Sequence, residues 1–206
     1  MSDQNELKKI LKKVNPDVIY HLATAGAYSY QNNPDVIIQT NILGTWNLIK
    51  ASMEIDYELF INTGTSSEYG FKDLPMKETD CIEPSSFYAV SKAAQTLLSS
   101  YVGKSLNKPI VTLRLFSVYG PFEEPTRLIP TLMQSLLKKK MMKLVDPDIA
   151  RDMVYIDDVL ELYLMIETLS EHAGGYFNVC SGKESTIKEV VNEAIMITGQ
   201  TTELVW

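Results

Sequence analysis

Residues 58–92 read ELFINTGTSSEYGFKDLPMKETDCIEPSSFYAVSK, and this stretch decides the predicted fold. Its first part, residues 58–63, is apolar and is followed by small polar residues, which predicts a short buried strand. A polar loop occupies residues 64–84. We expect a helix over residues 86–102, with a serine at its start. Strand, loop and helix in this order are one step of an alternating α/β pattern.

The same alternation continues on both sides of this stretch. Upstream, residues 17–22 (DVIYHL) predict a buried strand, and residues 34–53 predict a long helix that begins at a proline. Downstream, residues 110–116 (IVTLRLF) predict another strand. Strands that alternate with helices of more than ten residues predict a doubly wound, Rossmann-like parallel α/β sheet. Helices on both faces of such a sheet explain why its strands are continuously apolar.

After residue 116 prolines divide the chain into shorter pieces. We expect a truncated dinucleotide-binding domain over residues 1–120 and a small α/β substrate lobe over residues 121–206. The expected elements of this part are helices at 127–138, 157–170 and 186–198 and short strands near 142–145, 153–156 and 176–180.

Composition excludes several classes of function. The 206 residues carry a net charge of -7, and the basic run at residues 138–140 is interpreted as a solvated helix end, so we expect no nucleic-acid partner. Two histidines are too few for a histidine-based metal site, and Cys81 and Cys180 are too far apart in sequence to suggest metal-ligand spacing. We expect reduced thiols, a cytoplasmic location and no bound metal. No apolar run approaches the ~18 residues of a membrane span, so no membrane partner is expected.

Tyr88 and Lys92 are the strongest candidates for chemistry. Four residues apart on a helix, they share one face. A lysine ammonium favours the phenolate and lowers a phenol pKa that is otherwise ~10. The tyrosine can then exchange a proton with a sugar hydroxyl while a hydride moves to or from a nicotinamide. Thr65, Ser66 and Ser67 supply hydroxyls at the end of the preceding strand, where parallel sheets bind ligands. Taken alone, the spacing is also that of a surface tyrosine beside a solvated lysine.

Seven segments in order resemble the extended short-chain dehydrogenase/reductases, the NAD-dependent epimerase/dehydratase family that modifies sugar nucleotides. Together they extend over nearly the whole chain. The segments are His21-Leu22-Ala23, Asn41-Ile42-Leu43-Gly44-Thr45, residues 63–70 (TGTSSEYG), Tyr88 to Lys92, residues 114–121 (RLFSVYGP), residues 151–158 (RDMVYIDD) and residues 177–182 (FNVCSG).

The resemblance implies a role for each matching position. Tyr88 would be the general acid/base, Lys92 would lower its pKa and bind the nicotinamide ribose, and Thr65 aligns with the catalytic Ser/Thr. The residues implied to line NAD or NADP are Leu22, Ala23, Thr24, Asn62, Thr63, Tyr88, Lys92, Phe116 and Val118. The residues implied to contact a nucleotide-diphosphate sugar are Ser66, Ser67, Ser117, Arg127 and Arg151.

Simpler interpretations stay open for four residues. His21 fits a packed strand residue better than a catalytic one, and Asn41 fits a tie between its helix and neighbouring backbone. Arg151 can equally pair with Asp157 or Asp158. Asn178 can serve only to close a turn.

The chain departs from the family pattern in three places. No Gly-rich turn between a strand and a helix precedes residue 17, so we expect an N-terminally truncated fold that lacks its first βα units and with them part of its cofactor binding. Ser66 and Ser67 stand where the sugar 4,6-dehydratases carry Asp-Glu, which favours an epimerase or a 4-reductase. Ser117 replaces a usual asparagine, which alters expected substrate contacts.

Two functions follow from this pattern. The first is NAD(P)-dependent epimerisation or reduction of a nucleotide-diphosphate sugar. The alternative is a catalytically inactive fragment or paralogue that acts as a binding or oligomerising module. For either one the resemblance implies a homodimer formed through the helices at 34–53 and 86–102.

Overall fold

The computed structural model describes residues 3–206, apart from the side chains at positions 166 and 167. The chain divides into two compact units, one of Met1–Leu115 with Glu161–Val179 and one of Phe116–Leu160 with Cys180–Trp206. The sequence-based division at residue 120 assigned everything beyond it to the second lobe, whereas the structure returns Glu161–Val179 to the first unit.

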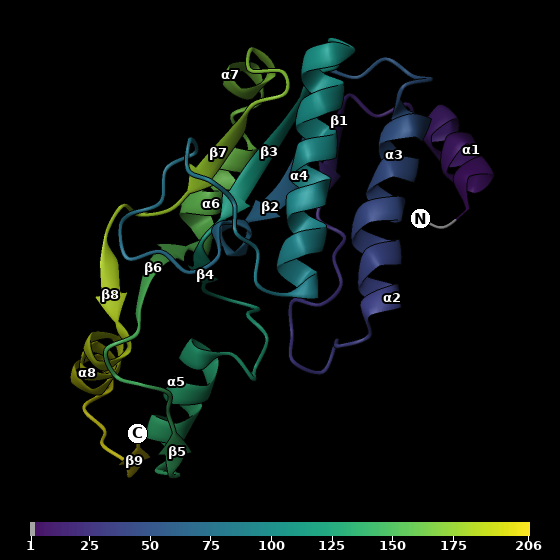
Figure 1. Cartoon of the computed structure of the whole chain (residues 1–206). Helices are drawn as coiled ribbons and strands as arrows, with labels where there is room; N and C mark the ends of the chain where they lie inside the picture. Colours follow the sequence, from purple (N-terminus) through teal and green to yellow (C-terminus); the bar gives the residue numbers. More distant parts are fainter. Residues whose placement is uncertain (1–2) are drawn as a thin grey trace. The chain divides into compact units, whose positions relative to one another are not determined.

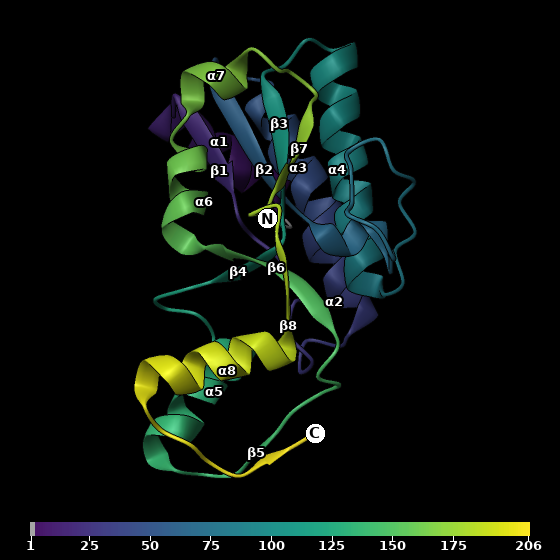
Figure 2. The same ribbon diagram turned by 90° about the vertical axis from the view of Figure 1, so that its left-hand side faces the viewer.

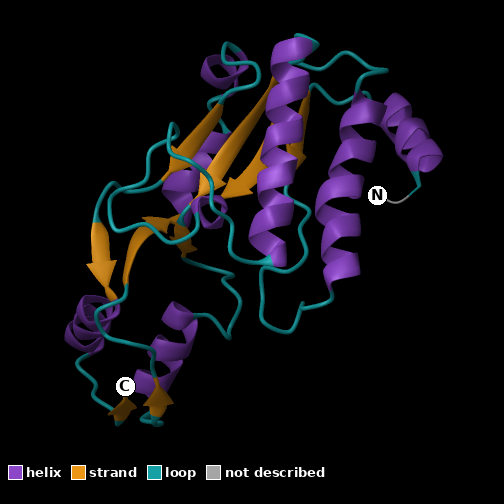
Figure 3. Cartoon of the chain, viewed as in Figure 1, coloured by secondary structure: helices purple, strands orange, loops and turns teal. Residues whose placement is uncertain are grey.

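The first unit contains a four-stranded parallel sheet, as the sequence predicted (Figures 1 and 3). Its order is β1–β2–β3–β7, with β1 at Val18–His21, β2 at Leu59–Thr65, β3 at Ile110–Leu115 and β7 at Tyr176–Val179. The last strand was expected in the small lobe, but it pairs with β3, where Leu113 lies opposite Phe177. A short strand cannot reveal its partner from sequence, because pairing depends on residues distant in the chain.

Helices cover both faces of this sheet, which is the doubly wound arrangement. The long helix α4 (Phe87–Ser105) packs on β2 and β3 from one side, and the short helix α7 (Ile166–Ser170) approaches the same strands from the other (Figure 2). Because helices pack on both faces of β2, this strand is buried along nearly its whole length. The first helix, α1 (Gln4–Val14), is capped by the Asp3 carboxylate and buries Leu11 in the core of this unit.

The helix predicted over residues 34–53 is interrupted by a wider turn. It consists of α2 (Pro34–Ile38), a π-helical segment (Gln39–Gly44) and α3 (Thr45–Ser52). The Thr45 hydroxyl donates a 2.6 Å hydrogen bond to the Asn41 carbonyl, the acceptor that a regular α-helix reserves for the backbone N–H of residue 45. Such π-helical turns occur frequently at functional sites.

The second unit contains two small sheets and two packed helices. Strand β6 (Ala150–Tyr155) pairs parallel with β4 (Ser117–Tyr119) and antiparallel with β8 (Glu184–Thr186), and β5 (Met142–Lys143) pairs with β9 (Leu204–Val205). Helices α5 (Leu128–Lys138) and α8 (Ile187–Thr198) pack together over a core that includes Leu132, Leu136, Ile187 and Val191. Strands β4, β8 and β9 were not predicted, because two or three residues carry too little periodicity.

The helix predicted over residues 157–170 is two helices, α6 (Ile156–Tyr163) and α7. Cys81 and Cys180 are both exposed, and no disulfide joins them in the described part of the chain.

Candidate active site

The Thr65 hydroxyl is held by a tight turn at the end of β2. A short 3₁₀ helix, Ser66–Tyr69, follows the strand directly. The Thr65 Oγ1 atom accepts the Ser67 backbone N–H at 3.3 Å, and the Thr65 backbone N–H donates to the Glu68 carboxylate at 3.0 Å. This reciprocal capping box fixes the side chain at the carboxyl end of the strand, where open parallel sheets bind ligands. Ser66 and Ser67 lie in the same turn.

Tyr88 and Lys92 lie at the start of α4, which begins one residue after the predicted boundary. The Ser86 hydroxyl accepts the Ala89 backbone N–H at 3.1 Å and caps the helix. Tyr88, the second helical residue, is half-buried, whereas Lys92 is only 2% exposed. Lys92 therefore is not a solvated surface lysine, which was the simpler interpretation of the pair.

Lys92 connects α4 to the end of β2. Its ammonium donates to the Thr63 carbonyl at 2.5 Å and to Gln95 Oε1 at 2.6 Å. Burial lowers the pKa of Lys92 to about 8, against an opposing effect of the nearby Glu68 carboxylate. A lysine has three donors, so one N–H remains beyond these two bonds.

The loop after β1 is tied to this helix through Asn41. Its side chain accepts the Ala25 N–H and donates to the Ala25 carbonyl, both at 2.8 Å, and it also donates to Ser91 Oγ at 2.8 Å. Asn41 is fully buried. The interpretation of Asn41 as a tie between helix and backbone is confirmed, and the tie reaches the residue next to Lys92.

A glycine allows this loop to approach Tyr88. Gly26 has φ +89°, and a Cβ added there would lie 3.3 Å from the Tyr88 Cβ and 2.8 Å from Ile37 Cδ1. Earlier in the same loop, three residues that were predicted to line the cofactor are all exposed: Leu22, Ala23 and Thr24. The surface of these three residues is therefore accessible in the loop that Asn41 ties to α4.

His21 is a packed core residue, as its simpler interpretation held. It is 2% exposed, and its Nε2 lies 2.7 Å from Thr45 Oγ1. Burial, together with the charge on Lys92, lowers the pKa of His21 to about 4. The ring is therefore neutral at pH 7.

The two strand-end residues that were predicted to line the cofactor have different environments. Asn62 is fully buried, and its side chain donates to Thr112 at 3.1 Å. Thr63 is half-buried, and its hydroxyl lies 2.7 Å from the Tyr163 hydroxyl. Burial raises the pKa of Tyr163 to about 12, so this phenol stays protonated. Sequence reasoning missed Tyr163, because no local motif surrounds it.

A buried ion pair supports the Thr65 turn from behind. Glu68 and Arg114 are 0% and 2% exposed, and the Arg114 Nε donates to Glu68 Oε2 at 2.8 Å. Arg114 also donates to the Tyr69 hydroxyl at 2.8 Å, and that hydroxyl donates to Asn178 Oδ1 at 2.7 Å. Asn178 does more than close a turn, because it also donates to the backbone carbonyl of Met76.

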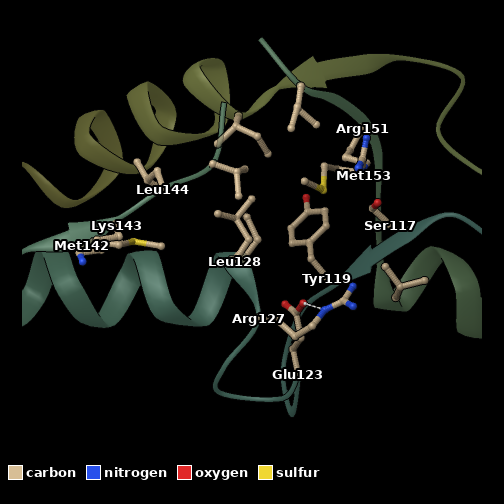
Figure 4. A pocket seen from close by; sticks show the side chains of 15 residues that line it. Ser117, Tyr119, Glu123, Arg127, Leu128, Met142, Lys143, Leu144, Arg151 and Met153 are labelled. Atoms are coloured by element: carbon tan, nitrogen blue, oxygen red, sulfur yellow. Dashed lines mark hydrogen bonds and ion pairs between the residues drawn. The ribbon is translucent and has the colours of Figure 1, made fainter. Parts of the chain in front are cut away.

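The second unit contains a cavity of about 440 Å³ (Figure 4). Four residues predicted for cofactor or substrate line it: Ser117, Val118, Arg127 and Arg151. Sequence reasoning missed its other polar lining residues, Tyr119, Glu123 and Lys143, although Tyr119 belongs to the Tyr-Gly-Pro segment. Phe116 is half-buried at the start of this unit and is not among the lining residues.

The two arginines of this cavity have different partners. Arg127 pairs with Glu123 at 3.3 Å, and Arg151 donates to the Ala150 carbonyl at 2.8 Å. Among the ion pairs of the described residues, none joins Arg151 to Asp157 or Asp158, so that alternative for Arg151 is wrong.

Residues 1–180 match the sequence profile of the NAD dependent epimerase/dehydratase family. The match includes both α4, with Tyr88 and Lys92, and the Thr65 turn. The chain therefore belongs to the NAD-dependent epimerase/dehydratase family, and its fold is that of the extended short-chain dehydrogenase/reductases.

Several curated relatives of this chain carry the names of enzymes that act on sugar nucleotides. A probable UDP-glucuronate 4-epimerase of Rhizobium meliloti (strain 1021) is 27% identical over 165 residues, which are 78% of this chain and 48% of the relative. A GDP-6-deoxy-D-mannose reductase of Pseudomonas aeruginosa is 30% identical over 188 residues, which are 85% of this chain and 61% of the relative. The chain thus spans about half to two thirds of the length of these relatives.

Solved structures share the fold closely. The UDP-glucuronic acid 4-epimerase from Bacillus cereus, in complex with UDP-glucuronic acid and NAD, has a TM-score of 0.87 and 29% identity, and the match covers 98% of this chain and 66% of the other. RMD from Pseudomonas aeruginosa, complexed with NADPH, has a TM-score of 0.88 and 28% identity over 99% of this chain and 73% of the other. In the described part of this chain, no helix has the length and apolar character needed to span a membrane.

Proposed function

We propose that this chain carries the proton-transfer centre of an NAD(P)-dependent epimerase or 4-reductase that acts on a nucleotide-diphosphate sugar. Tyr88 is the general acid/base, Lys92 favours its phenolate, and the Thr65 hydroxyl holds the same sugar oxygen. A bound nicotinamide cofactor would supply or accept the hydride. The serines at positions 66 and 67 leave no carboxyl pair beside Thr65, which favours these reactions over water elimination.

The buried ammonium of Lys92 carries this proposal. An ammonium that has lost its water, one helical turn from a half-buried phenol, stabilises negative charge on that phenol more strongly than a solvated lysine does. The Thr63 carbonyl and Gln95 hold the ammonium in place, so its position does not depend on a ligand. A phenol with a lowered pKa can both take and return a proton near neutral pH.

The nicotinamide end of a dinucleotide fits the residues around Lys92. The remaining Lys92 donor suits a ribose hydroxyl, and the exposed residues Ala23 and Thr24 lie in the loop that Asn41 ties to α4. NAD or NADP is therefore the proposed cofactor, in line with the NAD and NADPH bound to the similar solved structures.

The cavity of the second unit is the proposed site of the nucleotide diphosphate. Its cationic side chains, Arg127, Lys143 and Arg151, suit phosphate oxygens, and the guanidinium groups can bind them with two donors at once. Met142 and Leu144 supply apolar surface for a base. In Figure 4 these apolar side chains lie toward one end of the cavity, with Ser117 and Arg151 toward the other.

Turnover and cofactor binding test this proposal together. We expect the chain to bind NAD(H) or NADP(H) by calorimetry and to interconvert UDP-glucuronate and its 4-epimer, or to reduce a nucleotide-linked 4-keto sugar. Tyr88→Phe should lower kcat by about 10² to 10⁴. Tyr20→Phe is the matched control, because Tyr20 lies on β1, outside the proposed proton-transfer residues, and is 41% exposed. No binding at millimolar cofactor overturns the enzyme proposal for this chain and leaves the binding or oligomerising module.

A homodimer through the helices at 34–53 and 86–102 is the second part of the proposal. On α4 the side chains of Phe87, Val90, Leu97 and Tyr101 are 49–65% exposed and fall within an arc of ~80° at 3.6 residues per turn. On the preceding helical segment Val36 and Leu43 are also exposed. Apolar stripes of this kind on adjacent helices are typical of an interface rather than of a solvated face.

Light scattering tests the dimer. We expect a dimer at micromolar concentration and a shift to monomer in Leu97→Lys. Leu137→Lys is the control, because Leu137 is 64% exposed on α5 of the other unit. A monomeric wild-type chain at 100-fold higher concentration contradicts the proposal.

A further inference from the structure

Glu123 is the one carboxyl group among the described residues that line the cavity of the second unit. It lies in the turn between β4 and α5, where its backbone N–H donates to the Gly120 carbonyl at 3.3 Å. Its side chain is only 13% exposed. The other charged lining residues, Arg127, Lys143 and Arg151, are cationic, as an anionic ligand requires. A carboxylate among these cations would repel an anionic ligand, so its presence in the cavity requires an explanation.

The two oxygens of Glu123 are in different situations. Oε1 accepts the Arg127 Nε–H at 3.3 Å, as drawn in Figure 4. Oε2 is buried and has no hydrogen-bond partner among the described residues. Burial raises the pKa of Glu123, and the ion pair with Arg127 opposes that shift. A buried acceptor without a donor is costly, and in native proteins it is rare enough to require an explanation.

Charge and hydrogen-bonding capacity restrict the ligand group that can reach this oxygen. An ionised carboxylate only accepts hydrogen bonds, so a phosphate oxygen is repelled and a hydroxyl or an N–H is favoured. The Arg127 Nε is paired with Glu123, while the terminal NH₂ groups of the same guanidinium supply further donors. The Glu123–Arg127 pair therefore presents an acceptor and a set of cationic donors side by side.

A ribonucleoside diphosphate offers the complementary pair of groups. Its ribose hydroxyls, on C2′ and C3′, are donors, and its anionic diphosphate is attached to C5′ of the same sugar. Acidic side chains commonly accept a hydrogen bond from a ribose 2′-hydroxyl in nucleotide sites. We propose that Glu123 accepts a hydrogen bond from the 2′-hydroxyl of the nucleotide ribose, while Arg127 binds the 5′-diphosphate, so that the chain selects ribonucleotide sugars over 2′-deoxyribonucleotide sugars. This inference rests on the proposed nucleotide-diphosphate substrate.

Calorimetric titration with UDP and with 2′-deoxy-UDP tests the selection without cofactor or turnover. The two probes differ by one hydroxyl and share base and diphosphate. Because a hydrogen bond to a charged group is lost with the hydroxyl, we expect UDP to bind the wild-type chain about ten-fold more tightly or better. In Glu123→Ala the two probes should bind equally. Glu124→Gln is the matched control, because Glu124 is the adjacent carboxyl and does not line the cavity, and it should keep the wild-type ratio.

The other outcomes of these titrations distinguish the inference from the proposed function. Equal binding of the two probes by the wild-type chain, or an unchanged ratio in Glu123→Ala, overturns the inference. If Glu123→Gln weakens the binding of UDP more than that of GDP and keeps the preference for UDP over 2′-deoxy-UDP, Glu123 Oε2 accepts from a base N–H. That result also overturns the inference. Absence of binding by both probes overturns this inference together with the proposed substrate class. Selective binding without turnover overturns the proposed reaction alone. Thermal melting by circular dichroism verifies that each variant is folded.

Discussion

Replacing Glu68 by glutamine removes the negative charge from the buried pair behind the Thr65 turn and changes little else in shape. The carboxylate accepts hydrogen bonds from the Thr65 N–H, the Thr96 hydroxyl and the Arg114 Nε, at 3.0, 2.9 and 2.8 Å. All three groups donate. A glutamine amide can accept at one oxygen only, and its NH₂ must face one of these donors.

Burial determines the expected cost. Breaking a buried ion pair by removing one partner destabilises a protein by about 3–5 kcal/mol, because the remaining charge is left in a poorly solvated site. Here that charge is Arg114, which is 2% exposed. A loss of about 4 kcal/mol is a large share of the ~5–15 kcal/mol that stabilises a native domain. With a urea slope of about 2 kcal/mol/M, the unfolding midpoint should fall by about 2 M.

Urea unfolding followed by Trp46 fluorescence measures this loss, since Trp46 packs against the core of the first unit. Trp206 is replaced by phenylalanine in every variant, so that the signal comes from one unit. Glu83→Gln is the control: the Lys72–Glu83 pair has the same 2.8 Å separation, but Glu83 is 64% exposed, and exposed pairs contribute about 0–1 kcal/mol. If Glu68→Gln lowers the unfolding free energy no more than Glu83→Gln does, burial does not determine the contribution of the Glu68–Arg114 pair.

Three further predictions concern the same unit. The pKa of Lys92 is lowered from 10.5 to about 8, so the unfolded chain binds this proton more tightly than the folded chain does. As pH rises from 8 to 10.5, the unfolding free energy of the wild type should therefore increase by on the order of 3 kcal/mol relative to that of Lys92→Met. Equal pH dependence of the two unfolding free energies would contradict this. The pKa of His21 is lowered to about 4, so stability should fall as pH drops from 6.5 to 4, and His21→Gln should lose that dependence in thermal melts. Asn41→Ala removes the hydrogen bonds to Ala25 and Ser91, and it should lower the unfolding free energy measured in urea by about 2–4 kcal/mol. It should also weaken cofactor binding measured by calorimetry. An unchanged cofactor affinity would show that the Ala25 loop does not contribute to cofactor binding.

Local chemistry made much of the first unit predictable. Residues 58–63 form most of β2 because a run of apolar residues between polar loops is stable only when it is buried. Ser86 and Asp3 cap their helices because a hydroxyl or a carboxylate satisfies the free N–H groups of the first turn. The strand–loop–helix pattern placed Tyr88, Lys92 and three hydroxyl residues near one another, and the family resemblance singled out Thr65 among those hydroxyls.

The sequence by itself determined the alternation of elements, the caps and the order of the motifs, since these depend on neighbours within a few residues. Only the tertiary structure decided that β7 joins the parallel sheet, that Lys92 is buried rather than solvated, and that Glu68 forms an ion pair with Arg114. The physical reason is that strand pairing, desolvation and buried charge depend on groups many residues apart. The unpaired oxygen of Glu123 belongs with them, because the walls of its cavity come from several separate segments of the chain.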